Sequence, residues 1–286
     1  MEGTGSVSEK TYRLINLLDD EAEEIRDGVR SQLAERVEEL AAFLGDEGDG
    51  GRTLTSTQRR VIEGMLRERS RVQFVSGWEG WQHIHGELDR LEAGMKYLSV
   101  FLGPLRSARG ELLVEALDRL AEKCRELGMD ESAGRLAGYL LGGEGMYSKN
   151  EEDFYDPRNF DLLWVIENGR GNEWSLACLV VMVGRRLGIK VDGCDYPGRF
   201  MARFMEEREI FLIDACHGGG LIPGVEASEL RPVGSDEVRE TIARPATARV
   251  ILKRGLEGLE TAFLRRGEVG DAAMVRDCLQ AMVVKR

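Results

Sequence analysis

The amino-acid sequence predicts an α+β fold in which helices dominate. Over the first half of the chain, apolar residues recur at helical spacing. Around residues 200–213 the side chains alternate with a period of two, which is typical of strands, and helical spacing returns after residue 245. We therefore expect a helical N-terminal half, an α+β core with a small antiparallel sheet, and a C-terminal helical pair.

The first segment, Thr11 to Leu44, has the pattern of an amphipathic helix. Leucine, isoleucine and valine recur every three to four residues with charged residues between them. The pair Asp19 and Asp20 suggests a break into two short helices, so we expect an N-terminal helical hairpin over residues 1–45. A glycine-rich acidic connector, residues 45–52, follows it.

Four further helices are expected over residues 54–143. Glycines at 77, 103, 128 and 142 and Pro104 mark their limits. The expected helices are Ser56–Phe74, Trp78–Phe101, Ser107–Leu127 and Asp130–Leu141.

The pattern changes in the last region, residues 156–286. Helices are expected over Pro157–Asn168 and Asn172–Leu187, the second capped by Asn172. A β-hairpin with a turn near Glu207 and Arg208 follows, and residues 189–192 form a short further strand. Beyond the glycines at 218–220 the chain returns to helices, at about 245–266 and 270–283.

Composition limits the function classes. The 286-residue chain is 42% hydrophobic and 31% charged, as in soluble globular proteins. Its net charge of −12, without a basic stripe with interleaved aromatics, disfavours a nucleic-acid partner. A polar N-terminus and the lack of a long apolar run disfavour secretion and membrane spanning. Five cysteines without a CxxC pair indicate reduced thiols in a cytoplasm, and no cofactor is expected.

Three segments follow one another in an order that suits a thiol-based acyl-transfer site. They are the helix start at GNEWSL, the turn PGRF and the strand end at FLID. Such a site needs a thiol at a helix N-terminus, where the helix dipole lowers its pKa, and a histidine on a neighbouring strand. A carboxylate must then orient that histidine. The three segments lie at the positions where the thiol, the histidine and the carboxylate of such a site would be expected.

The order of motifs resembles the SirB-type branch of the transglutaminase-like superfamily. Proteins of that branch have a glycine-rich turn into a helix, RRLG at the helix end, a PGHF motif, a strand that ends in Asp and a C-terminal helical pair. The resemblance covers Asp156–Leu221 and Arg249–Met282, and it implies a papain-like α+β core. The matching positions are Gly169, Gly171, Asn172, Ser175, Leu176, Arg185, Arg186, Leu187, Gly188, Pro197, Gly198, Phe200, Asp214 and Gly219.

The resemblance fails at the residues that would carry the chemistry. Counted back from Gly188, the station of the nucleophilic cysteine falls at Glu173, or at Ser175 if the register shifts by two. The histidine of PGHF is Arg199 here, and a guanidinium cannot act as a base because its pKa lies above about 12. Only Asp214 keeps the residue type of the triad. The usual catalysis is expected to be silent.

Two roles are open for Arg199. It can replace the histidine in an ion pair with Asp214, since an orphaned buried carboxylate would be costly. Alternatively, Arg199 and the helix N-terminus near Asn172 make the former catalytic cleft a pocket for a small anionic ligand, a carboxylate or a phosphate. We favour the ion pair.

A relocated thiol site is the alternative. Cys178 lies on the same helix and could act with His217, which follows Asp214 closely in sequence. Cys194 and Cys216 also lie near the motifs, and with His217 these thiols would suit a tetrahedral metal ion. However, Cys178 lies within LACLVVMV, where cysteine is usually a small buried hydrophobic residue. We predict no metal site.

The sequence therefore predicts a catalytically silent transglutaminase-like protein that acts in binding or scaffolding. Its degenerate cleft or its helical surfaces would contact an unknown protein or a small anionic ligand. The alternative is a thiol-dependent acyl-transfer or amide-hydrolysing enzyme that uses Cys178 with His217 and Asp214.

Overall fold

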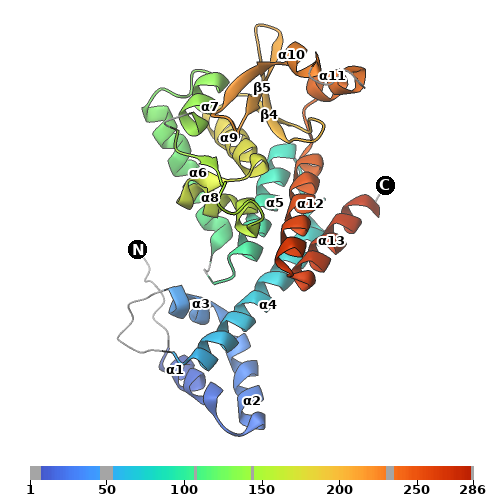
Figure 1. The fold of residues 1–286 in the computed structure, drawn as a ribbon. Coiled ribbons are helices and arrows are strands. Elements are labelled where there is room, and N and C mark those ends of the chain that lie inside the picture. The colour runs from blue at the N-terminus through green and yellow to red at the C-terminus, as the bar shows by residue number, and fades with distance from the viewer. Residues whose placement is uncertain (1–7, 46–53, 106–107, 143–144, 230–234, 285–286) are drawn as a thin grey trace. The chain divides into compact units, whose positions relative to one another are not determined.

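The computed structural model describes residues 8–45, 54–105, 108–142, 145–229 and 235–284. The chain forms two compact units, the smaller from residues 1–76 and 100–109 and the larger from residues 77–99 and 110–286. Helices α4 (Ser56–Trp81) and α5 (Glu87–Leu102) contribute to both. The predicted class, α+β with helices dominant, is confirmed (Figure 1).

The smaller unit begins with the expected helical hairpin. Its elements are α1 (Glu9–Asn16), the 3₁₀ turn η1 (Leu17–Asp19), α2 (Glu23–Ala34), α3 (Val37–Gly45) and the first part of α4. The break predicted at Asp19 and Asp20 is confirmed, since η1 ends there. A second break, after α2, was not predicted. From residue 46 onward, the expected connector 45–52 lies outside the described residues.

Glu39 holds α3 to the start of α1. Its carboxylate accepts hydrogen bonds from the Thr11 hydroxyl at 2.6 Å, from the Ser8 hydroxyl at 2.7 Å and from the Ser8 backbone N–H at 3.0 Å. These bonds, the one from Thr11 first, lower the pKa of Glu39 from 4.5 to about 2. Because Ser8 is also the N-cap of α1, one carboxylate organises the entry into this unit.

Neutralising Glu39 should change how the smaller unit responds to acid. A carboxylate with a lowered folded pKa contributes stability that is present above its unfolded pKa, near 4.5, and is lost as the pH falls towards about 2. We expect Glu39→Gln to destabilise the unit at neutral pH and to remove much of this acid dependence. The exposed Glu24→Gln should do neither. Urea unfolding followed by circular dichroism across this pH range measures the effect, and an unchanged acid response in Glu39→Gln would contradict it.

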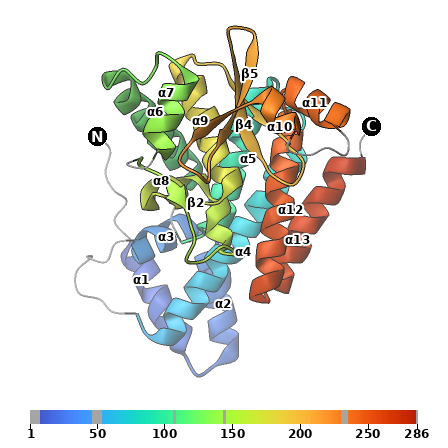
Figure 2. The same ribbon diagram turned by 45° about the horizontal axis from the view of Figure 1, so that its top comes forward.

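The larger unit contains most of the helices. They are α6 (Arg109–Glu126), α7 (Ala133–Leu141), the 3₁₀ turn η2 (Pro157–Phe160), α8 (Leu162–Asn168), α9 (Glu173–Leu187), α10 (Gly224–Glu229), α11 (Ser235–Ala243), α12 (Ala248–Arg266) and α13 (Val269–Val284). The predicted C-terminal pair is confirmed as α12 and α13, which lie side by side (Figure 2). The single helix predicted over 157–168 is wrong, because Asp161 leaves the helical conformation and caps α8 with its side chain. Helices α10 and α11 were not predicted.

The break between α4 and α5 lies later than predicted. The sequence placed it at Gly77, but α4 continues to Trp81. A Cβ at Gly77 would lie 2.6 Å from the Tyr97 ring, so this glycine lets α4 approach α5 closely. The chain instead turns before α5 at Gly86, whose φ of 87° suits glycine.

Four antiparallel strands form the main sheet. Their order is β3 (Val191–Cys194), β4 (Met201–Glu206), β5 (Glu209–Asp214) and β6 (Gly220–Pro223). The predicted hairpin is confirmed, and its turn residues Glu207 and Arg208 both have positive φ, as a tight hairpin turn requires. The strand predicted at 189–192 starts two residues later. The prediction missed β6, a four-residue strand that begins within the glycine run.

Two short strands occupy segments where none was predicted. β1 (Ser148–Lys149), which lies between the predicted regions 54–143 and 156–286, pairs in parallel with β2 (Arg170–Gly171), which immediately precedes α9. This pairing places the segment after β1 beside the start of α9.

Helix α9 is the buried centre of the larger unit. Every residue from Trp174 to Gly184 is buried, and the helix contacts β3, β4, α7, α8 and α12. Asn172 begins the helix through a reciprocal capping box with Ser175, and Gly188, with a φ of 75°, ends it. The helix predicted over Asn172–Leu187 is confirmed.

The arginines of the RRLG motif anchor the C-terminal end of α9. Arg185 pairs with Asp89 of α5. Arg186 reaches Asp118 of α6 at 2.6 Å and Glu92 of α5 at 2.9 Å. These cations also interact favourably with the helix dipole at this end. The motif therefore helps to fix the position of α9.

The outer face of the main sheet is covered by α10 and α11 (Figure 1). The apolar side chains that meet there are Cys194, Met201, Leu212, Ala227, Val238 and Ile242. Arg203 of β4 adds a polar link, because it donates to the carbonyl of Ile242 in the last turn of α11.

Gly255 of α12 makes room for Trp174 of α9. A Cβ at Gly255 would lie 2.4 Å from the indole ring, and the indole Nε1 donates to the carbonyl of Ile251 at 2.8 Å. The ring is buried and held at both places, so it has little freedom to move.

Adding a methyl group at Gly255 should therefore be costly. We expect Gly255→Ala to destabilise the larger unit by about 1–3 kcal/mol through overpacking. Gly138→Ala, at an exposed site of α7 with open space around it, should instead stabilise it by about 0.5–1 kcal/mol. Urea unfolding followed by tryptophan fluorescence compares the two variants. Equal stability of both would mean that the Trp174 ring is not held in place.

Candidate functional site

Three elements of the larger unit meet at the first turn of α9. Glu173 begins this helix, Arg199 lies in the turn that leads into β4, and Asp214 ends β5. The turn is set by Gly198, whose φ is 81°, and by a hydrogen bond from the Arg199 N–H to the Tyr196 carbonyl at 2.9 Å. The structure thus brings together three of the residues that the sequence singled out.

The guanidinium of Arg199 bridges two carboxylates. Its Nη2 lies 2.7 Å from Asp214 Oδ1 and its Nη1 lies 3.2 Å from Oδ2. Its Nε donates to Glu173 Oε2 at 3.2 Å. The hydrogen bonds to Asp214, with the charges of both carboxylates, raise the pKa of Arg199 further above its usual value. The ion pair expected between Arg199 and Asp214 is present.

Asp214 is the most heavily bonded group of the site. Besides Arg199, it accepts hydrogen bonds from the backbone N–H of Cys216 at 3.2 Å and from His217 Nδ1 at 3.0 Å. Burial opposes ionisation of this carboxyl, but the hydrogen bonds from Arg199 and His217 and the charge of Arg199 outweigh burial and lower its pKa. Because an ionised carboxylate only accepts, Nδ1 of His217 carries the hydrogen.

Ser175 is committed to the helix cap. Its hydroxyl accepts from the Asn172 N–H at 3.0 Å and donates to the Asn172 carbonyl at 3.1 Å, and the residue is fully buried. A Cβ at Gly171 would lie 2.6 Å from this hydroxyl, which explains the glycine at that position. The geometry favours a structural role for Ser175 over a nucleophilic one.

Cys178 and His217 lie in different environments. Cys178 is 1% exposed, and desolvation raises the pKa of its thiol well above the usual value. The His217 side chain is 76% exposed and hydrogen-bonds to Asp214. A thiol buried in this way holds its proton at neutral pH and does not meet reagents from solvent.

The cysteines near the motifs lie in different environments. Cys194 faces α10 and α11, where its thiol lies 3.9 Å from the Thr241 carbonyl. Cys216, by contrast, belongs to the site and is partly exposed. Burial, then the negative charge of Glu173, raise the pKa of Cys216 to about 11, and the positive charges of Lys149 and Arg199 partly offset this. Lys149 of β1 was not singled out in the sequence, because nothing there places β1 beside α9.

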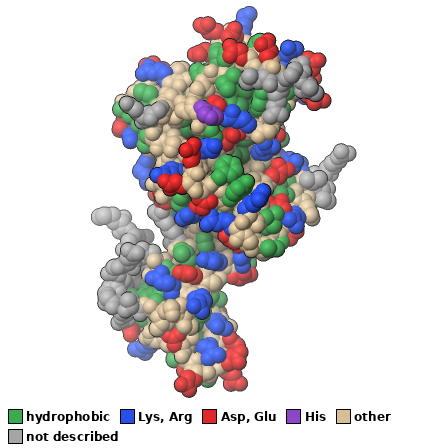
Figure 3. Space-filling model, viewed as in Figure 1, with side chains coloured by type: hydrophobic (Ala, Val, Ile, Leu, Met, Phe, Trp, Pro, Cys, Tyr) green, Lys and Arg blue, Asp and Glu red, His purple; other side chains and the backbone are tan. Residues whose placement is uncertain are grey.

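Arg199, Glu173 and Asp214 together carry a net charge of −1. Arg199 faces Glu173 and Asp214, so a further anion would meet one cation already paired with two carboxylates. This arrangement supports the ion-pair role of Arg199 over the anion pocket. On the face seen in Figure 3, acidic and basic side chains are interspersed and form no broad basic area.

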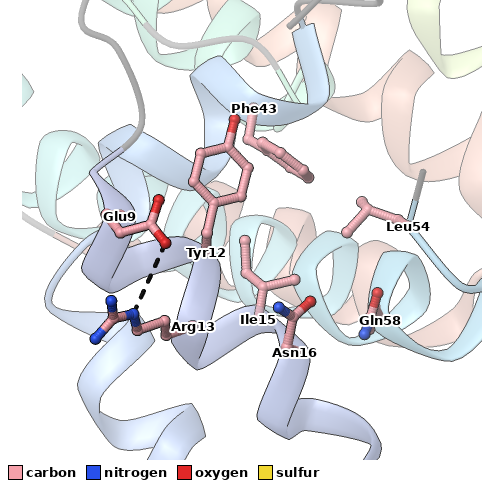
Figure 4. Close-up of a pocket in the computed structure, with 8 residues that line it drawn as sticks. All are labelled: Glu9, Tyr12, Arg13, Ile15, Asn16, Phe43, Leu54 and Gln58. Carbon is pink, nitrogen blue, oxygen red and sulfur yellow. Dashed lines mark ion pairs between the residues drawn. The ribbon is translucent and has the colours of Figure 1, made fainter. Parts of the chain in front are cut away.

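Two hollows occur away from these residues. One, of about 390 Å³, is lined by Asn150, Glu152, Asp153, Asp156, Arg158, Trp164, Asn168 and Arg170. The other, of about 350 Å³, lies in the smaller unit between α1, the end of α3 and the start of α4 (Figure 4). Its walls are apolar at Tyr12, Ile15 and Phe43, and Glu9 and Arg13 form an ion pair of 3.7 Å at its edge. The residues that line either hollow include no cysteine or histidine.

Within the described ranges, no group of three or more His, Cys, Asp or Glu side chains is arranged to hold a metal ion. The same residues include no helix with the length and apolar character that a membrane span requires.

The fold agrees with a comparison to known families. A family model described as the transglutaminase-like superfamily matches residues 111–257, just over half of the chain. The chain belongs to the transglutaminase-like superfamily. The match begins at α6, ahead of the limit expected at residue 156, and it includes Glu173, Arg199 and Asp214. The predicted division into 1–45, 54–143 and 156–286 stays a prediction.

Two curated relatives are proteins of Xylella fastidiosa. A UPF0162 protein of Xylella fastidiosa strain 9a5c is 36% identical over 143 residues, which are 48% of this chain and 51% of that protein. The UPF0162 protein of strain Temecula1 is 35% identical over 143 residues, with the same coverage. The chain thus spans about half the length of the curated relatives it matches. No solved structure matches it.

The environments of the cysteines predict their reactivity. With iodoacetamide at pH 7, we expect Cys178 to stay unmodified in the folded protein and Cys216 to react slowly, at a rate that rises with pH up to about 11. Glu173→Gln should speed the reaction of Cys216 at a given pH, because it removes a charge that disfavours the thiolate. Peptide mapping by mass spectrometry measures both. Rapid modification of Cys178 at pH 7 would contradict the expectation.

Proposed function

We propose that this protein is a catalytically silent member of the transglutaminase-like superfamily that acts by binding or scaffolding. The observation that supports this most is the bridge from Arg199 to Glu173 and Asp214, at the stations where a thiol and an imidazole would be needed. Glu173 at the helix start has a carboxylate and no nucleophilic thiol. The guanidinium of Arg199 is already protonated at physiological pH, so it cannot act as a general base. We also propose that the chain is of the SirB type and acts in the cytoplasm.

The bridge also explains why the altered site is stable. Arg199 is 31% exposed and Asp214 11%, so the pair lies between a surface and a buried ion pair. Removing one partner from such a pair costs roughly 1–3 kcal/mol, less than in a fully buried pair because of solvent screening. The site therefore has a structural reason to keep arginine, independent of any reaction.

The thiol-enzyme alternative has one supporting feature. Asp214 orients His217 at 3.0 Å, as the third group of a triad orients its base. The nucleophile is the weak element, because Cys178 is buried and Cys216 carries a raised pKa. A binding role therefore has stronger support than the thiol-enzyme alternative. We propose that the altered site or the helical surfaces bind the partner, which is a protein or a small anionic ligand.

A pair of substitutions tests catalytic silence. Glu173→Cys with Arg199→His places a thiol at the first turn of α9 and an imidazole beside Asp214. We expect the wild-type protein to release no ammonia from glutamine-containing peptides above the buffer rate. The double variant should gain rapid alkylation at the new thiol at pH 7, since the helix dipole and an imidazole both favour the thiolate.

The single variant Glu173→Cys is the matched control: it keeps the permanent cation Arg199 beside the new thiol, so it should also be alkylated rapidly, but it lacks the imidazole that could transfer a proton. Ammonia release by the wild-type protein that is lost in Cys178→Ser or His217→Gln would overturn the proposal and favour the thiol enzyme.

A further inference from the structure

The loop that follows β1 displays two aromatic side chains to solvent. Phe154 is 55% exposed and Tyr155 is 39% exposed. Their rings meet edge to face, with centroids 5.1 Å apart and an angle of 89° between the planes. Neighbouring exposed aromatics of this kind are enriched at protein–protein contact sites.

Buried asparagine side chains form hydrogen bonds with the backbone of the loop that carries these aromatic residues. The buried amide of Asn159 donates to the carbonyls of Asp153 at 2.9 Å and Phe154 at 3.3 Å. Asn150, also buried, donates to the amide oxygen of Asn159 at 2.9 Å. A display that is already ordered lowers the entropic cost of binding a partner.

Two cations lie against the aromatic rings. The ammonium of Lys149 is 5.8 Å from the centroid of Phe154, and the guanidinium of Arg265 in α12 is 5.3 Å from that of Tyr155. Both contacts are within the usual range of cation–π pairs. Residues far apart in sequence thus form one surface, which we call the aromatic patch: Lys149, Phe154, Tyr155 and Arg265.

The cations of the aromatic patch differ from the other basic residues around it. Arg158 pairs with Asp156 at 2.7 Å, Arg266 pairs with Asp153 at 2.7 Å, and Arg170 pairs with Glu152. Across the described part of the chain, no carboxylate forms an ion pair with Lys149 or Arg265. In a chain with a net charge of −12, these two cations lie against exposed rings, where the carboxylates of a partner can reach them.

We propose that the aromatic patch docks a partner protein through an acidic segment that also carries apolar or aromatic side chains. Carboxylates of the partner would pair with Lys149 and Arg265, and its apolar side chains would cover the two rings. A planar anionic membrane fits less well, because the patch has only Lys149 and Arg265, whereas sites for anionic lipids typically gather about four to eight basic residues. This proposal rests on the binding role proposed above and names the partner more closely. The peptide test measures no catalysis, so a failure of the docking proposal can be told apart from a failure of the proposed catalytic silence.

A peptide selection tests this proposal on the full chain. Random dodecapeptides displayed on phage are selected on the wild-type protein and depleted on the double variant F154S/Y155S. We expect the surviving peptides to combine Asp or Glu with aromatic or apolar residues. Synthetic copies should bind the wild type, lose affinity about tenfold or more with Lys149→Glu or Arg265→Glu, and bind more weakly as salt is raised.

The controls are exposed residues of similar type outside the patch. Val225→Ser, at a side chain that is 71% exposed, and Lys190→Glu should leave binding unchanged. Thermal unfolding checks that each variant is folded, and the two charge variants keep both rings in place. Peptides without acidic residues, or peptides that bind F154S/Y155S as well as the wild type, would overturn the proposal. Patch-dependent binding to vesicles of phosphatidylserine and phosphatidylcholine, without binding of acidic peptides, would also overturn it in favour of a membrane.

Discussion

The burial of α9 is the constraint on which the rest of the larger unit depends. A helix that is apolar on all sides must be surrounded, and α9 is enclosed by the main sheet on one side and by helices on the others. No polar group can be placed along its middle without a cost, so its polar residues are confined to the two ends. One end carries Arg185 and Arg186, which pair with α5 and α6. The other end, at Asn172 and Glu173, is the one at which ligand or reaction chemistry could occur.

This arrangement fixes the form of the site independently of the side chains that it carries. The first turn of α9, the turn before β4 and the end of β5 converge because of the packing of α9 and the sheet, whatever side chains they carry. Histidine between a thiol and Asp214 would exchange a proton, whereas Arg199 between Glu173 and Asp214 is a permanent cation. The same scaffold is therefore compatible with an acid–base site or with an electrostatic lock. In this chain the side chains form the lock.

The parts of the structure that could be predicted from sequence are those set by local physics. Helix α9 has a continuous apolar run, an N-cap at Asn172 and a terminating Gly188, and its limits follow from these. The β4–β5 hairpin follows from alternation and a short turn. By contrast, Gly77 has the local character of a helix breaker, yet it serves the close approach of Tyr97, a contact that no neighbouring residue reveals. Strands β1, β2 and β6 are too short for a periodic pattern and exist only through their pairing.

In the site, too, some features could be predicted from the sequence and others depend on packing. Sequence motifs were sufficient to predict that Glu173, Arg199 and Asp214 lie close together, because each lies at the end of a recognisable element. They could not distinguish Cys194 from Cys216, since the face of a strand or loop on which a thiol lies depends on packing by α10 and α11. Nor could they reveal Lys149, whose place beside Cys216 depends on the pairing of β1 with β2.

Lys149 also connects the two surfaces for which functions are proposed. Its backbone pairs with Gly171, one residue before the cap of α9, while its ammonium lies over the ring of Phe154 and its charge acts on the thiol of Cys216. Occupation of the aromatic patch by a carboxylate would partly cancel that charge at short range, where solvent screening is incomplete. The thiolate of Cys216 would then be less favoured. Docking at the loop and the electrostatics around Cys216 are therefore linked through a single side chain.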